Sequence, residues 1–171
     1  EKLLSYSSGI FGFPLRLLAR ENYEKAVNRI GLSKVALITG EEKIYPKEAK
    51  YFFCTVESMP KNISVDCVII DEVQLAADYE RGHIFTDRIL NLKGNFLTIF
   101  LGSLNIENIL KKIYPNIEVE KKNRFSQLRF LRKQNFSKLE PRSAIIAFNI
   151  NKVYEIAENI RTHKGGTAVV L

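Results

Sequence analysis

Short apolar runs rich in Val, Ile and Phe alternate with longer amphipathic stretches over the first 120 residues. Apolar runs bounded by polar residues are typical of strands buried on both faces, and apolar residues spaced three and four apart are typical of helices. The predicted strands are GIFGF (9–13), KVALIT (34–39), YFFCTV (51–56), VDCVIID (65–71) and NFLTIFLG (95–102). The predicted helices cover 14–31, 83–92 and 104–114. This alternation predicts an α/β fold with a mostly parallel sheet.

The pattern changes after residue 118. The segment that follows is basic, and the alternation in SQLRFLRK (126–133) predicts a more exposed strand. A new unit then begins, with a buried strand predicted at 143–148, a helix at 149–163 and a further strand at 167–171. We therefore expect a first domain over 1–120, a basic connection over 121–140 and the start of a second domain over 141–171. We also expect the first domain to lack its beginning and the second its end.

The charge of the chain favours polyanions as partners. Its formal net charge is +7, and ten Lys and Arg stand against four Glu between Glu107 and Arg142. Aromatic residues are interleaved with these charges: Tyr114, Phe125, Phe130 and Phe136. The segment could thus form a nucleic-acid surface, or simply a solvated basic face beside core aromatics. No apolar segment approaches the roughly 18 residues that would cross a membrane, and we expect a soluble intracellular protein.

The two cysteines lie in apolar, strand-like runs. Cys54 is in YFFCTV and Cys67 in VDCVII, and neither has the spacing of a paired metal or redox motif. Buried free thiols are the favoured interpretation.

Two adjacent carboxylates, Asp71 and Glu72, end the run VIIDEVQLA. Ligands of parallel α/β sheets bind at the carboxyl ends of the strands, which is where these acids are predicted. An Asp there can hold Mg²⁺ through water, and the next residue can face an attacking water. The alternative is that the acids simply favour the first turn of a helix.

Six short segments resemble, in order, the motifs of superfamily 2 helicases. FPLRLLA (13–19) resembles motif Ia, TGEE (39–42) motif Ib, CTVE (54–57) the element that follows, DEVQ (71–74) the Walker B box, LGS (101–103) motif III and IIAF (145–148) motif IV. With Arg81 and Gly82 after DEVQ, the chain resembles the mitochondrial degradosome RNA helicase and its alphaproteobacterial relatives over essentially its whole length.

The resemblance implies an ATP-dependent RNA helicase with two RecA-like domains, helices on both faces of each sheet, and ATP and Mg²⁺ at their interface. It implies RNA as single strand or as duplex with an overhang, an exoribonuclease as partner, no membrane, and a bacterial cytoplasmic or mitochondrial matrix location. The resemblance implies that Asp71 holds Mg²⁺, that Glu72 acts on the attacking water and that Gln74 couples the site to the second domain or to the γ-phosphate. It implies that Gly102 and Ser103 communicate with the RNA. The implied nucleic-acid contacts are Pro14, Arg16, Thr39, Gly40, Thr55 and Glu57.

The residues agree with this interpretation. Pro14 opens a helix whose free N–H groups can receive a phosphate, and Arg16 lies in its first turn. Thr39 and Thr55 follow apolar strands, so their hydroxyls are expected at the same sheet edge as Asp71. Local cap or turn hydrogen bonds remain the alternative for both threonines, and Arg16 could equally be an ordinary solvated residue.

Two parts of a helicase ATP site are missing from the sequence. There is no G-x-x-x-x-G-K-[ST] loop to hold phosphates, and we expect it to precede Glu1, as we expect the motif VI arginines to follow Leu171. This chain alone should therefore hydrolyse ATP poorly or not at all. Two alternatives stay open: a non-catalytic RNA-binding module, and a metal-dependent nuclease or phosphatase that uses Asp71 and Glu72 directly.

Overall fold

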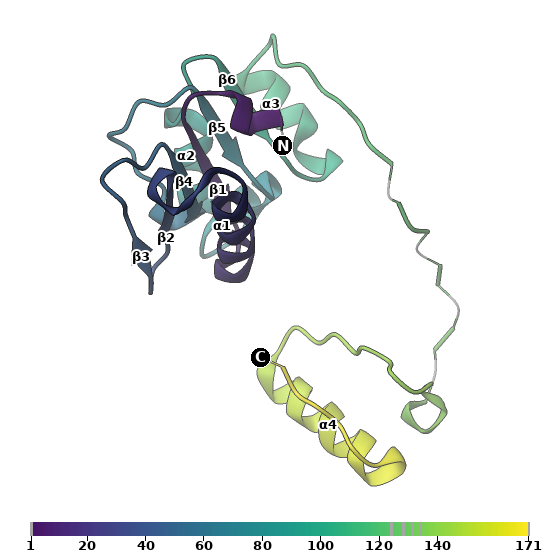
Figure 1. Ribbon diagram of the computed structural model, residues 1–171. Helices are drawn as coiled ribbons and strands as arrows, with labels where there is room; N and C mark the ends of the chain where they lie inside the picture. Colours follow the sequence, from purple (N-terminus) through teal and green to yellow (C-terminus); the bar gives the residue numbers. More distant parts are fainter. Residues whose placement is uncertain (1, 124, 128, 131, 134, 171) are drawn as a thin grey trace. The chain divides into compact units, whose positions relative to one another are not determined.

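The five strands predicted in the first 120 residues are all present in the computed structural model, which describes residues 2–123, 125–127, 129–130, 132–133 and 135–170. They join a short extra strand in one six-stranded sheet of order β3-β2-β4-β1-β5-β6 (Figure 1). Only β3 runs antiparallel to its neighbour. The predicted α/β class is therefore confirmed. The strands are β1 (Gly9–Phe13), β2 (Val35–Ile38), β3 (Lys43–Ile44), β4 (Tyr51–Thr55), β5 (Cys67–Ile70) and β6 (Leu97–Phe100).

The sheet is buried on both faces because the side chains of each strand alternate between two apolar clusters. In β1, Ile10 belongs to one cluster and Phe11 to the other. Cys54 and Cys67 are likewise on opposite faces, and both are buried thiols outside any disulfide, as predicted. Full burial of an Ile or Phe side chain contributes about 2 kcal/mol, so the two clusters together supply most of the driving force for folding.

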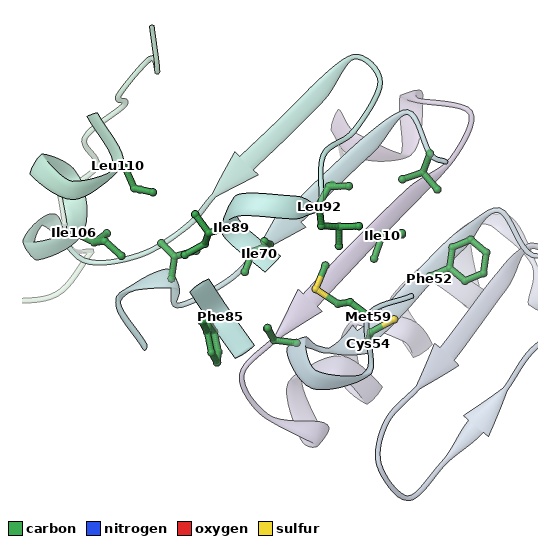
Figure 2. Packing of buried hydrophobic residues seen from close by; sticks show 14 of the residues in the cluster. Ile10, Phe52, Cys54, Met59, Ile70, Phe85, Ile89, Leu92, Ile106 and Leu110 are labelled. Atoms are coloured by element: carbon green, nitrogen blue, oxygen red, sulfur yellow. The ribbon is translucent and has the colours of Figure 1, made fainter. Parts of the chain in front are cut away.

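Helices cover both faces. On one face α1 (Arg16–Ile30) packs through Ala19, Tyr23 and Ala26. On the other face α2 (Gly82–Asn91) and α3 (Glu107–Ile113) pack through apolar side chains, and Figure 2 shows Ile89 of α2 next to Ile70 of β5. The residues that pack there, from the two helices and the turn before α3, are Phe85, Ile89, Ile106 and Leu110. The three predicted helices are thus confirmed, although the first residues of the segment predicted at 104–114 form a 3₁₀ turn rather than part of α3.

Single 3₁₀ turns connect many of these elements. They are η1 (Lys2–Ser5), η2 (Leu32–Lys34), η3 (Val56–Ser58), η4 (Val73–Ala77), η5 (Leu104–Ile106) and η6 (Phe136–Lys138). No helix in the described part of the chain combines the length and apolar character that crossing a membrane requires.

Residues 121–171 form a second unit. Its main element is α4 (Ile150–Lys164), which begins where the Asn149 side chain accepts hydrogen bonds from the N–H groups of Asn151 and Lys152. The helix ends at Gly165, whose φ of 90° is accessible to glycine without strain. The helix predicted at 149–163 is therefore confirmed.

The strand predictions in this unit were wrong for the residues that can be described. Residues 143–148 and 167–170 have no strand pairing, and the described part of 126–133 has none either, while residues 128, 131 and 171 lie outside the described set. The expected burial of 143–148 also fails, because Ile146 is 82% and Phe148 is 103% exposed. A strand satisfies its N–H and C=O groups only through a neighbouring strand, and no ladder partner exists among the described residues of this unit.

Candidate active site

The strand ends bring the predicted site residues of the first unit to a single edge of the sheet. The parallel strands end almost in register, since Phe13 pairs with Thr55, Ile38 with Cys54 and Ile70 with Phe100. The segments that follow these ends therefore lie at the same edge. They carry Pro14 and Arg16 after β1, Thr39 and Gly40 after β2, Thr55 and Glu57 at β4, Asp71, Glu72 and Gln74 after β5, and Gly102 and Ser103 after β6.

Asp71 is held directly at the end of β5. Its N–H donates to the carbonyl of Gly12 at 2.9 Å, and its Oδ1 accepts from the N–H of Glu72 at 2.9 Å. Burial raises the pKa of the Asp71 carboxyl, against the opposing hydrogen bond from the Glu72 N–H, and the Glu72 charge raises it further. Oδ2 has no hydrogen-bond partner among the described residues, so this oxygen is available to a cation or a water.

Glu72 has a backbone conformation that residues with a β-carbon rarely adopt. Its φ of 53° and ψ of 44° lie in the left-handed region, and η4 begins at the next residue. This conformation is unfavourable by about 1–2 kcal/mol for an L-residue other than glycine. Strain of this kind persists only where the surroundings impose it, and it is concentrated at functional sites.

Gln74 connects the acidic pair to the end of β6. Its Nε2 donates to a carboxylate oxygen of Glu72, and its Oε1 accepts from the N–H of Ser103 at 3.1 Å. A Cβ on Gly102 would lie 2.6 Å from that Oε1, so a larger residue there would displace the amide from this position. Glu72, Gln74 and Ser103 thus form one continuous hydrogen-bonded chain.

Replacing Glu72 with glycine is expected to give a more stable protein than replacing it with alanine. Both substitutions remove the carboxylate, but only glycine relieves the left-handed strain, which should raise the free energy of unfolding by about 1 kcal/mol over the alanine variant. Urea unfolding of Glu72→Gly and Glu72→Ala measures the difference. Equal stabilities would show that the relief of strain does not exceed the greater unfolded-state entropy of glycine.

The amino end of α1 is open towards the same edge. Leu15 is the N-cap residue, and the helix has neither a side-chain cap nor an acidic residue in its first turn. Its first N–H groups therefore remain available to an anion. Arg16 is not a simply solvated residue, because its guanidinium forms an ion pair with Glu41 from the loop after β2.

Local hydrogen bonds occupy the two predicted threonines. The Thr39 Oγ1 accepts from the N–H of Glu42 at 3.0 Å, which closes a turn that leaves Gly40 exposed at its tip. Thr55 is buried and its Oγ1 donates to the Oγ of Ser58 at 3.1 Å. Both hydroxyls therefore stabilise the loops that follow their strands, which is the alternative that the sequence left open.

Two arginines that the sequence did not single out as site residues hold the β4 end in place. Arg81 donates to a Glu57 carboxylate oxygen at 2.8 Å and to the carbonyl of Pro14 at 2.7 Å. Arg88 is only 7% exposed and donates to the carbonyls of Val56 at 3.2 Å and Glu57 at 2.9 Å. Arg88 lies on the apolar stripe of α2 with Phe85. A charged residue on the core-facing side of a predicted helix was the sequence signal that could have indicated its buried role.

Comparison of the sequence with models of protein families identifies the domain that carries this site. The family model for the DEXQ-box helicase domain of Suv3 matches residues 1–123. The chain belongs to the Suv3 family. The family assignment from the six motifs is confirmed, and so is the RecA-like α/β fold that it implied for the Suv3-type domain.

Curated Suv3 proteins align with nearly the whole chain. The mitochondrial ATP-dependent RNA helicase SUPV3L1 of Gallus gallus is 28% identical over 179 residues, which cover 99% of this chain and 22% of the relative. The mitochondrial helicase DExH18 of Arabidopsis thaliana is 28% identical, with coverage of 100% and 23%. The mitochondrial helicase SUV3 of Candida albicans is 31% identical, with coverage of 96% and 24%. The chain therefore spans between a fifth and a quarter of the length of these relatives.

Proposed function

We propose that this chain is part of an ATP-dependent RNA helicase, in which ATP hydrolysis drives the unwinding of RNA. The observation that carries the proposal is the hydrogen-bonded chain from Glu72 through Gln74 to Ser103, beside the Asp71 carboxylate. A motor must connect its nucleotide site to its nucleic-acid site. The hydrogen bonds from Glu72 through Gln74 to Ser103 supply such a connection between the ends of β5 and β6. The names of the curated relatives support the same activity.

Asp71 fits a role as a Mg²⁺ ligand. Mg²⁺ bound with a nucleotide usually keeps several waters and takes one or two carboxylates together with phosphate oxygens. Asp71 would supply the carboxylate of such an arrangement, because only its Oδ1 is engaged by a hydrogen bond among the described residues. When bound, the cation would neutralise charge on the phosphates of ATP.

Glu72 and Gln74 would act next to that cation. The Glu72 carboxylate would orient the attacking water and accept its proton, and Gln74 already positions that carboxylate through its amide. Because the same amide accepts from Ser103, a shift of Gln74 would be transmitted to the Gly102–Ser103 turn. We assign coupling to these three residues.

The RNA strand would follow the β1, β2 and β4 ends. The open amino end of α1 at Pro14 and the Arg16 guanidinium would receive phosphates, and Gly40 leaves the tip of its turn accessible. Thr39, Thr55 and Glu57 would shape this surface, since their side chains hold its loops.

We further propose how the residues of this chain are divided among the domains of a larger helicase. Residues 1–120 would be the first RecA-like domain, 121–140 a basic connection and 141–171 the start of a second RecA-like domain that completes the ATP site. An exoribonuclease would be the partner in RNA degradation. The names of the relatives favour the mitochondrial matrix, with the bacterial cytoplasm as the other candidate location.

Glu72→Gln in the longer protein is expected to lower RNA-stimulated ATP hydrolysis by about 100-fold or more, because a general base contributes at least that factor. The matched control is Glu48→Gln, which removes a carboxylate before β4, at the opposite edge of the sheet. The 171-residue chain is expected to hydrolyse ATP weakly or not at all, since its sequence has no phosphate-binding loop. RNA-stimulated hydrolysis by this chain that disappears in Glu72→Gln would contradict that expectation.

A second candidate function is a non-catalytic RNA-binding module, favoured by the high positive charge and the absence of the phosphate-binding loop in this sequence. It requires salt-sensitive RNA binding that ATP and its analogues leave unchanged. Binding of labelled RNA by the longer protein, with and without a non-hydrolysable ATP analogue, separates the two functions.

A further inference from the structure

Tyr79 is the tyrosine of the first unit whose ring is left unpacked. It is 101% exposed, and its hydroxyl has no hydrogen bond to any described residue. Other tyrosines of this unit are engaged: the Tyr51 hydroxyl donates to the Tyr6 carbonyl at 2.5 Å, and the Tyr114 hydroxyl donates to the Ile89 carbonyl at 2.5 Å. An aromatic ring presented wholly to solvent contributes nothing to folding and is available to a ligand.

The loop that carries Tyr79 is fixed by hydrogen bonds. The Asp78 Oδ1 accepts from the N–H groups of Glu80 at 3.0 Å and Arg81 at 2.8 Å, and the Asp78 carbonyl accepts from the N–H of Gly82 at 3.0 Å. A Cβ on Gly82 would lie 2.5 Å from the Ala76 carbonyl, so the start of α2 packs directly against η4. The Cα of Tyr79 is therefore held in place although its ring is free.

The same loop is joined to the surface proposed for RNA. Arg81, two residues after Tyr79, donates to the Pro14 carbonyl at 2.7 Å and pairs with Glu57. These two contacts fix the loop against the ends of β1 and β4. Tyr79 thus projects from a short, anchored loop beside the segments that would contact the RNA backbone.

We propose that Tyr79 is a base-stacking residue of the nucleic-acid site. This inference rests on the proposed function, and it adds a contact of a different chemical kind to the phosphate contacts of that site. A tyrosine ring stacks on the flat face of any unpaired base, and such stacking tolerates changes of sequence. The occupant is therefore an unpaired base of a single strand rather than a duplex, whose bases are already stacked on one another.

The test uses the 171-residue chain and a fluorescein-labelled oligouridylate of about 12 nucleotides, within the range that single-strand sites cover. Tyr79→Ala is expected to weaken binding by about tenfold, and Tyr79→Phe, the matched control, is expected to bind like the unchanged chain because it keeps the ring. The dependence of the affinity on salt should be the same in all three proteins, since no phosphate contact is removed.

A second probe removes the bases. With an abasic sugar-phosphate oligomer of equal length, Tyr79→Ala and the unchanged chain should bind equally. The chain contains no tryptophan, so Tyr79→Trp places a single fluorescent indole at this position, and its emission should be quenched by the oligouridylate and unaffected by the abasic oligomer. Thermal unfolding of each variant verifies that the fold is intact.

Two results would overturn the inference and leave the proposed function standing. One is oligouridylate binding that is the same for Tyr79→Ala and the unchanged chain, and the other is an indole emission of the Tyr79→Trp variant that RNA does not alter. The absence of RNA binding by the unchanged chain would overturn both the RNA-binding part of the proposed function and the role of Tyr79.

Discussion

Arg88→Met should lower the free energy of unfolding by about 3 kcal/mol, because it leaves the carbonyls of Val56 and Glu57 without their donor inside the protein. Methionine keeps the length and the apolar stem of the side chain, so the loss measures the guanidinium contacts rather than a cavity. Asp87 also loses the ion pair that it forms with Arg88. The effect is large because Arg88 is 7% exposed and water cannot replace the missing donor.

Arg20→Met is the matched control for this substitution. Arg20 is on the exposed side of α1 and pairs with Glu24 and Glu42 in solvent. Exposed ion pairs contribute less than about 1 kcal/mol, so this variant should remain nearly as stable as the unchanged protein. Urea unfolding compares the two variants. If Arg88→Met were no less stable than Arg20→Met, the guanidinium of Arg88 would not hold η3 in place.

Gly94→Ala is expected to lower the free energy of unfolding by a similar amount, about 3 kcal/mol, through a clash that no side-chain rotation relieves. A Cβ at this position would lie 2.7 Å from the Asp66 carbonyl oxygen and 2.8 Å from the Cys67 Cα, and it would also overlap the Leu97 carbonyl. All of these atoms are backbone. The turn into β6 would have to open, and with it the bonds from Phe96 and Leu97 to the Asp66 carbonyl.

Gly40→Ala provides the comparison, since a Cβ at Gly40 would meet nothing within 4 Å. Its stability should change by less than about 0.5 kcal/mol. The urea concentrations at the unfolding midpoints of the two variants give the difference in stability, provided that the slopes of the two transitions are equal. A Gly94→Ala midpoint that matched that of Gly40→Ala would mean that the turn adjusts without opening.

The sequence predicts the sheet of the first unit well because burial on both faces makes each strand a continuous apolar run. β3 was missed, because a strand of only two residues, Lys43 and Ile44, is too short to give an apolar run or an alternation. The strand at 143–148 was predicted from the same kind of apolar run and is absent. An apolar run expresses a tendency to be buried, and a strand forms only where a neighbour pairs with it.

The position of the site could likewise be predicted from local sequence patterns, whereas its long-range contacts could not. That Asp71, Thr55 and Ser103 come to one edge could be predicted, because parallel strands end together. The contacts that organise the edge could not, since Gln74 to Ser103 and Arg81 to Glu57 join residues 29 and 24 positions apart. No periodicity encodes such pairs. The left-handed backbone of Glu72 is equally invisible in the sequence, because glutamate ordinarily avoids it.

The two buried thiols can report local opening of the sheet, one on each of its faces. Burial raises the pKa of the Cys54 thiol to about 12 and that of the Cys67 thiol to about 11, so neither is a reactive thiolate while the sheet is closed. Cys54 lies next to Met59 on the face that α2 and α3 cover (Figure 2), and Cys67 lies on the face that α1 covers. The rate at which an alkylating reagent modifies each cysteine therefore reports how often that face of the sheet opens to solvent, in the unsubstituted protein.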